Sequence, residues 1–255
     1  MLKKRLIFTL LYNSGIFSLS RNFRLQDVGD IKWLNENYNF DYISKYIDEL
    51  IVLDVSRSRR DINAFSDILK KLTEKIFVPI SSGGGIRKYE DAKILLDSGA
   101  DKVIINSSLF TDQELIFNLS SEFGRQCLVG SLDIKKEGKE YEAYIQNGTK
   151  KINKNNHEIL SILKKSPIGE IMLHSIDRDG TGQGFDFDSL LFLNNKINLP
   201  VIISGGAGNG RHLVNGLKHE RIDAVSSSHL FNFIGDGLKR ARQEAKQNKI
   251  ELANW

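Results

Sequence analysis

Cysteine is almost absent from this sequence: Cys127 is the only one among 255 residues. A single thiol excludes an internal disulfide framework and a cysteine-based zinc cluster, and it is typical of proteins kept in a reducing compartment. Cys127 falls within an apolar, strand-like run, so we expect a small buried hydrophobic side chain there rather than a nucleophile. We expect no metal ion and no cofactor.

Long apolar runs are absent as well, and no stretch reaches the roughly 20 residues that a transmembrane helix needs. The basic residues 3–5 followed by apolar residues 6–12 have the look of a short signal peptide. That run, however, breaks at Asn13-Ser14-Gly15 without a small-residue cleavage pattern. We interpret it as an internal strand and expect a cytoplasmic protein without membrane contact.

Charge of one sign is not in large excess, since 36 Lys and Arg against 32 Asp and Glu give a formal net charge of +4. So small a surplus gives no reason to expect nucleic acid as a partner, although it suits a phosphorylated small molecule. The arginines that do cluster, Arg57, Arg59 and Arg60, directly follow an expected strand. They are either a solvated loop or contacts to an anion, and both interpretations stay open.

What the sequence does contain is an internal repeat with an offset of about 122 residues. Ser82-Gly83-Gly84-Gly85 returns as Ser204-Gly205-Gly206-Ala207-Gly208, and Ala100-Asp101-Lys102-Val103 returns as Ile222-Asp223-Ala224-Val225. Short aliphatic runs alternate with helical patterns, which indicates parallel strands joined by helices. The expected strands are 5–11, 50–55, 77–82, 102–106, 127–134, 170–176, 200–204 and 224–228. We therefore predict an α/β fold: a single (βα)₈ TIM barrel over residues 1–255, with half-barrels at about 1–123 and 124–245.

Two segments are longer than a barrel connection requires. Residues 13–32 lack a helical period and predict a long loop over the barrel mouth, while residues 135–155 are broken by Asn147-Gly148 and predict a small hairpin. Both follow the carboxyl ends of strands, where barrel enzymes carry their chemistry. We therefore place both on the active face.

The two glycine clusters predict a pair of anion sites. Glycines directly after a strand let backbone N–H groups approach a phosphate closely, with a helix N-terminus nearby. The alternative is that they only permit tight turns. Two such sites on opposite sides of one mouth would hold a ligand with a phosphate at each end. The candidate contacts are Gly84, Gly85, Asn106 and Ser107 on one side, and Gly180, Gly205, Gly206, Ser227 and Ser228 on the other.

Longer motifs resemble the cyclase subunit of imidazole glycerol phosphate synthase: Ser82–Arg87, Gly99–Asn106, Ser-Ile-Asp-Arg-Asp-Gly-Thr at 175–181, and Ile203–Gly208. The resemblance covers nearly the whole chain. It implies a half-barrel-duplicated (βα)₈ fold, a ligand with two phosphates, and a partner glutaminase that supplies ammonia. Such subunits convert a phosphoribulosyl aminoimidazole into imidazole glycerol phosphate and an aminoimidazole ribotide.

The same resemblance implies two acid–base aspartates, at the ends of the first and fifth strands. Asp133 matches the second, but Leu11 stands at the position of the first, and Leu19 at that of a loop lysine. Losing a positioned general base typically lowers a rate by about 10²–10⁴. His174, at the end of the sixth strand, is a candidate substitute, and a histidine hydrogen-bonded into the barrel top is the alternative.

Charged residues begin four of the expected strands. Arg5, Glu49, Lys102 and Glu170 match the ring through which ammonia enters the family's barrel from the glutaminase. A purely structural ring of paired charges is the alternative. Asp101, beside Lys102, is a candidate contact with the partner.

The departure at Leu11 leads us to expect a paralogue with altered chemistry. Within the resemblance, such paralogues support amidination of surface-polysaccharide sugars, as a heterodimer with a glutaminase and alongside a third, amidotransferase enzyme. Two alternatives stay open: a genuine cyclase of histidine biosynthesis, and a non-catalytic module that activates the glutaminase and delivers ammonia.

Overall fold

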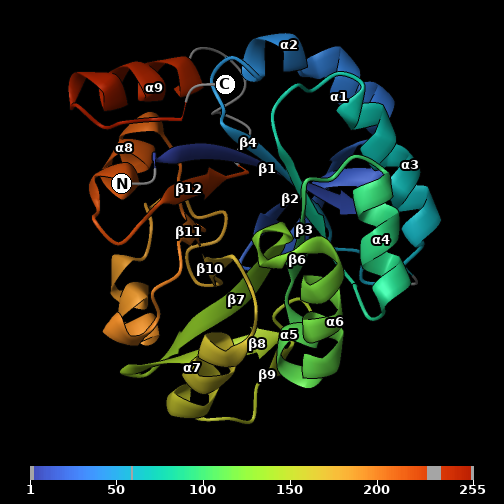
Figure 1. Cartoon of the computed structure of the whole chain (residues 1–255). Coiled ribbons are helices and arrows are strands. Elements are labelled where there is room, and N and C mark those ends of the chain that lie inside the picture. The colour runs from blue at the N-terminus through green and yellow to red at the C-terminus, as the bar shows by residue number, and fades with distance from the viewer. Residues whose placement is uncertain (1–2, 59, 229–236, 254–255) are drawn as a thin grey trace.

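A computed structural model describes residues 3–58, 60–228 and 237–253 (Figure 1). Arg59 of the arginine cluster lies outside these ranges. None of the helices in the described ranges combines the length and the hydrophobicity that crossing a bilayer requires. The two ends of the described chain meet, because Lys4 forms a parallel bridge with Leu252.

Eight parallel strands form a closed barrel. Hydrogen bonds join them in the order β1, β4, β5, β6, β7, β10, β11, β12, and β12 returns to β1. Their bounds are β1 Arg5–Asn13, β4 Glu49–Asp54, β5 Ile80–Gly83, β6 Lys102–Ile105, β7 Leu128–Glu137, β10 Glu170–Ser175, β11 Val201–Ser204 and β12 Ala224–Ser227. Four strands lie in each half of the sequence. The predicted (βα)₈ fold is confirmed.

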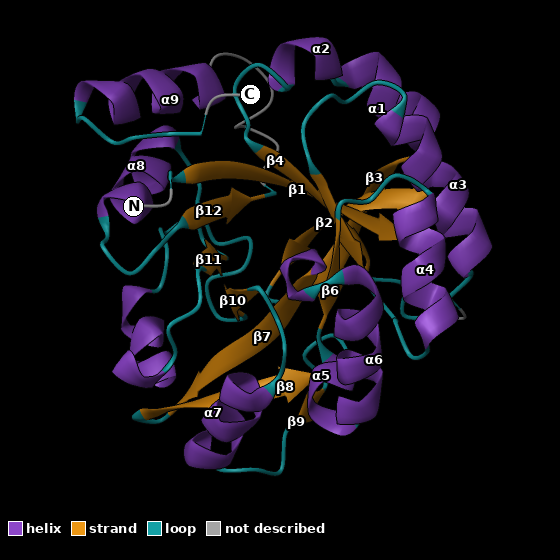
Figure 2. Ribbon diagram, in the orientation of Figure 1, coloured by secondary structure: helices purple, strands orange, loops and turns teal. Residues whose placement is uncertain are grey.

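Helices surround the strands, as Figure 2 shows. They are α1 Ile31–Asn37, α2 Phe40–Ile43, α3 Ile62–Thr73, α4 Tyr89–Asp97, α5 Ser107–Thr111, α6 Gln113–Phe123, α7 Asn156–Lys165, the 3₁₀ helix η2 Phe187–Lys196, α8 Gly210–Lys218 and α9 Gly237–Gln247. Helix α3 illustrates the local cause. The Asp61 carboxylate accepts the N–H groups of Asn63 and Ala64, and Phe65 and Leu69 are fully buried against the barrel.

Alternate residues of each strand face the barrel axis, which divides the interior into layers. The floor is charged, because each of the four predicted charges is the first residue of its strand. Above it lies one apolar cluster with members from seven strands: Ile7, Ile51, Ile104, Val129, Met172, Ile202 and Ala224. Leu11, Asp133 and His174 come near the opposite ends of the strands, at the mouth.

Both long segments form hairpins. The prediction of a loop at 13–32 was wrong, because β2 (Ile16–Arg21) and β3 (Arg24–Gly29) pair antiparallel and β2 extends the sheet from β1. The connecting residues Asn22 and Phe23 have φ values of +51° and +61°, which allow a two-residue turn. The predicted hairpin at 135–155 is confirmed, since β7 runs on to pair with β8 (Glu140–Ile145), which pairs with β9 (Lys150–Lys151).

Cys127 does not lie in a strand. The chain leaves α6 at Gly124 with a φ of +83° and makes one 3₁₀ turn, η1 (Arg125–Cys127), before β7 begins at Leu128. The thiol is consequently half-buried rather than buried. The expectations that Cys127 lies within a strand and is fully buried were therefore wrong.

Candidate functional site

The two glycine turns adopt backbone conformations that need glycine. Gly84 and Gly85 follow β5 with φ values of +112° and +73°, and Gly205 and Gly206 follow β11 with values of +93° and +106°. A Cβ atom on Gly84 would lie 2.1 Å from the carbonyl oxygen of Asp54. The positive φ values and the close backbone approach are enough to explain why glycine occurs in these tight turns. An anion-binding role therefore remains a prediction for both clusters.

One pocket at the mouth, named here the Gly84 pocket, collects the first set of candidates. Gly84, Gly85, Asn106 and Ser107 all line it, together with Leu11, Asp133 and His174. The remaining wall mixes apolar side chains with polar and charged ones, among them Arg57, Arg60 and Arg87. The predicted anion site and both candidate acid–base residues therefore share one cavity.

A second pocket, named here the Gly205 pocket, collects the second set. It is lined by Gly180, Gly205, Gly206, Ser227 and Ser228, the five candidates predicted for the other phosphate. Arg21, Arg24 and Lys135 add positive charge to its lining, against Asp177 and Asp179. All nine predicted contacts thus lie in two pockets, four in one and five in the other, and their role in phosphate binding stays a prediction.

The β2–β3 hairpin separates the two pockets. Ser20 and Leu25 line both. The buried carboxylate of Asp179 accepts the Ser20 hydroxyl at 2.5 Å and the Phe23 N–H at 3.0 Å, which fastens the hairpin over the mouth. The tip meets the second hairpin, because a Cβ on Gly148 would lie 2.6 Å from the Phe23 ring. A ligand that spans both pockets must pass beside or displace this hairpin.

Leu11 and Asp133 line the same pocket, as the barrel symmetry predicted. Asp133 is 8% exposed, and one carboxylate oxygen accepts the Asn106 side-chain N–H at 3.2 Å. Burial raises the pKa of Asp133 to about 6, although the charge of His174 opposes the rise. A carboxyl group with that pKa can exchange protons near neutrality, whereas Leu11 opposite it cannot.

His174 is the direct neighbour of Asp133, since the two are paired residues on β10 and β7. Its Nε2 lies 3.5 Å from Oδ1 of Asp179, an ion-pair distance, and has no hydrogen-bond partner within the residues described. The Phe23 ring packs edge-on against the imidazole at 4.9 Å. Burial by itself lowers the pKa of His174, but Asp179 and Asp133 outweigh it, so the pKa is raised. The charged imidazolium is thereby favoured.

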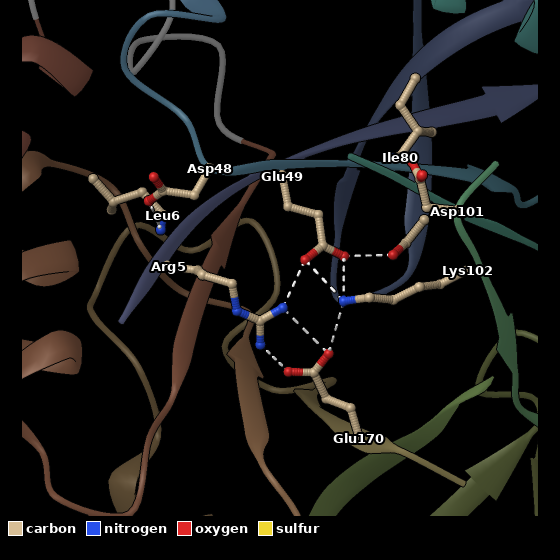
Figure 3. Close-up of polar contacts among 9 residues, drawn as sticks. Arg5, Leu6, Asp48, Glu49, Ile80, Asp101, Lys102 and Glu170 are labelled. Carbon is tan, nitrogen blue, oxygen red and sulfur yellow. Dashed lines mark hydrogen bonds and ion pairs between the residues drawn. The ribbon is translucent and has the colours of Figure 1, made fainter. Parts of the chain in front are cut away.

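The four predicted floor residues form one network (Figure 3). Arg5 donates to Glu49 at 2.7 Å and also to Glu170. Lys102 lies 3.2 Å from Glu49 and 3.3 Å from Glu170. Two cations and two anions balance, so the buried Glu49, 2% exposed, is not left unpaired. A pocket at this end of the barrel is lined by all four residues of the network.

Asp101 has a structural role at this end. It is one of three aspartates that each stand directly before a barrel strand. Each of the three carboxylates accepts a backbone N–H from the first or second residue of the neighbouring, earlier barrel strand: Asp48 from Leu6, Asp101 from Ile80, and Asp223 from Val201. Figure 3 shows the first two pairs. Asp101 is also exposed, and its contact with a partner stays a prediction.

Sequence reasoning missed several residues at the mouth. Asp179 was part of the Asp-Arg-Asp-Gly-Thr run but not a site candidate, and its place before Gly180 was the available signal. Phe23 had no signal, because only hairpin formation brings it over the pocket, whereas Asn147 was named as part of the second hairpin on the active face but not as a site candidate. Within the ranges described, no group of three or more His, Cys, Asp or Glu side chains could hold a metal ion.

Comparison with known proteins gives consistent similarities. Residues 31–233 match the family described as "Histidine biosynthesis protein". The chain is 49% identical over 256 residues to "Putative imidazole glycerol phosphate synthase subunit hisF2" of Parasynechococcus marenigrum, covering 100% of this chain and 95% of the relative. It is 35% identical to "Imidazole glycerol phosphate synthase subunit HisF" of Flavobacterium johnsoniae over 253 residues, 99% of each chain. The same-named protein of Dehalococcoides mccartyi is also 35% identical, over 234 residues and 91% of each.

Proposed function

The chain belongs to the histidine biosynthesis protein family and is HisF-like, and from this premise we propose that it is an ammonia-accepting barrel subunit. In this proposal a glutaminase docks at the charged floor and a ligand with two phosphates lies across the mouth. The relatives are named as subunits of a synthase, which supports an assembly of this kind.

The observation that carries the proposal is Leu11 in the same pocket as Asp133. The fold supplies two opposed positions for acid–base groups, and only one of them carries a carboxyl group. We therefore propose a paralogue with altered chemistry, supporting amidination of surface-polysaccharide sugars together with a third, amidotransferase enzyme.

Proton handling falls to neighbouring rather than opposed residues in this proposal. Nitrogen that arrives as ammonia and forms a C–N bond must lose protons, and Asp133 with a pKa of about 6 can accept one. His174 lies beside it on the next strand and favours its charged form, so it can return a proton. Asp179 stays ionised behind the imidazole, because His174 and the hydrogen bonds from Ser20 and Phe23 lower its pKa despite burial.

Ammonia reaches this pair through the barrel. The floor network must part to admit it, and breaking one ion pair is tolerable because each charge has a second partner. The apolar layer above excludes water and retains the small neutral molecule.

The test co-expresses the chain with a candidate glutaminase and follows three reactions: glutamine hydrolysis, conversion of the phosphoribulosyl substrate, and sugar amidination with an amidotransferase added. We expect stimulated hydrolysis, no imidazole glycerol phosphate, and amidination that requires all three proteins. Failure of the chain to bind or stimulate any glutaminase would contradict the proposal.

The variant Asp133→Asn distinguishes nitrogen-transfer chemistry on this chain from a non-catalytic module and from a genuine cyclase. Asp67→Asn, at an exposed position of α3, is the matched control. A fall of about 10²-fold or more in nitrogen transfer locates chemistry on this chain. A silent Asp133→Asn, with coupling disturbed by Arg5→Ala, identifies a non-catalytic delivery module. Rescue of a histidine auxotroph that is lost on Asp133→Asn identifies a genuine cyclase.

A further inference from the structure

Three arginines line the Gly84 pocket without a matching number of anions. Arg57, Arg60 and Arg87 contribute to its wall, and the carboxylates there are Asp54 and Asp133. With Asp54 and Asp133 both ionised, the three guanidinium groups still leave the pocket a surplus of positive charge before His174 is counted.

Arg60 lies directly against the glycine turn. A Cβ on Gly85 would lie 2.6 Å from its Cδ and 2.9 Å from Nη1, so the guanidinium borders the place where the predicted anion meets the backbone. Its Nε is buried, lies 3.8 Å from Asp54, and has no hydrogen-bond partner among the residues described. Burial, together with the charge of Arg87, lowers the pKa of Arg60, although Asp54 opposes the change.

The hydrogen bonds that these arginines do make go to neutral groups on the two hairpins. Arg57 donates to the carbonyl oxygen of Phe23 at the first tip, and Arg60 donates to the Asn147 side chain at 3.1 Å in the second. A phosphoryl oxygen is a stronger acceptor for a guanidinium than either partner. Of the three arginines, Arg60 has a carboxylate at ion-pair distance, Asp54 at 3.8 Å, and no ion pair joins Arg57 or Arg87 to a carboxylate among the residues described.

A single phosphate does not need these arginines. The turn at Gly84 and Gly85 and the Ser107 hydroxyl line the pocket and can donate to its oxygens, whereas the Asn106 amide already donates to Ser131 and Asp133. We propose that Arg57, Arg60 and Arg87 form a second phosphoryl subsite next to this turn. The Gly84 pocket therefore takes a diphosphate end. This rests on the proposed function, in which the same pocket holds one end of the ligand, and it adds a third phosphoryl group to that ligand.

The test measures binding of inorganic phosphate and pyrophosphate to the full chain by calorimetry at fixed ionic strength. We expect pyrophosphate to bind about 10- to 100-fold tighter than phosphate, as one or two added charge-assisted hydrogen bonds would give. Arg57→Gln and Arg87→Gln should each reduce that ratio about tenfold and leave phosphate binding within about threefold. Both side chains are exposed, so folding is preserved even if Arg60→Gln fails to fold.

Arg240→Gln, the same charge change at an exposed position of α9, is the matched control and should keep the wild-type ratio. An unchanged ratio in both pocket variants, or equal affinity for the two anions in the wild type, overturns the diphosphate subsite and leaves the proposed function intact. Binding of neither anion overturns both.

Discussion

Restoring a carboxyl group at position 11 tests whether the barrel still presents two opposed acid–base positions. Leu11 is 7% exposed and lines the pocket that holds Asp133. Leu11→Asp should therefore place a second carboxyl group in that pocket. If the rest of the cyclase geometry is retained, cyclase turnover should rise by about 10²–10⁴, which is roughly 3–5 kcal/mol of barrier.

The substitution has a cost that the assay must allow for. Losing a buried leucine removes about 1.5–3 kcal/mol of hydrophobic stabilisation, and the new carboxyl group must also be desolvated. For a chain of this size, each kcal/mol lowers the melting temperature by about 2–4 °C. Turnover is therefore measured well below the melting temperature of the variant, which circular dichroism establishes first.

The assay follows imidazole glycerol phosphate with saturating ammonium chloride, so that no glutaminase is needed. Leu11→Asn is the matched control, because it has the same shape and polarity but cannot transfer a proton. A folded Leu11→Asp no faster than Leu11→Asn would refute the reasoning that a missing carboxyl group separates this chain from the cyclases. Activity that persists in Leu11→Asp combined with Asp133→Asn would refute it as well.

Three further predictions concern Asp133, the floor and the hairpin. Because burial raises the pKa of Asp133 from 3.8 to about 6, the folded protein binds a proton that the unfolded chain releases between these values. Stability should thus fall by about 3 kcal/mol as pH rises through this window, and urea unfolding of Asp133→Asn should lack that fall. Glu49→Gln leaves the two floor cations with one carboxylate and should lower the free energy of unfolding, measured with urea, by about 3–5 kcal/mol. The control Glu36→Gln, at an exposed ion pair, should lower it by less than about 1 kcal/mol. Asp179→Ala removes the carboxylate that accepts the Phe23 N–H, so hydrogen exchange of the Phe23 amide should become about tenfold faster or more. An unchanged rate would show that Asp179 does not hold the β2–β3 hairpin in place.

The floor was predictable because it depends on local pattern alone. Residues two apart along a strand face the same side, so Arg5 and Leu11 had to share the barrel interior once the strand was recognised. Parallel pairing then brought Lys102 and Glu170 to the same end, and the ion pairs follow from opposite charges at contact distance.

The first hairpin, β2–β3, could not be derived in the same way. Residues 13–32 show no helical period, and that pattern by itself favours a loop. The strands β2 and β3 form because the edge of β1 continues past the barrel and offers unpaired N–H and C=O groups, with Leu11 opposite Ser18. That edge exists only in the folded barrel.

The sequence by itself determined the barrel, its charged floor, the two glycine turns and the substitution at Leu11, because each depends on periodicity, on an internal repeat or on the chemistry of one residue. Tertiary structure alone decided how the mouth is divided. Asp179 meets Ser20 across 159 positions, and Arg60 meets Asn147 across 87. Contacts between segments so far apart follow from the closure of the barrel and the direction of the hairpins, which no local pattern encodes.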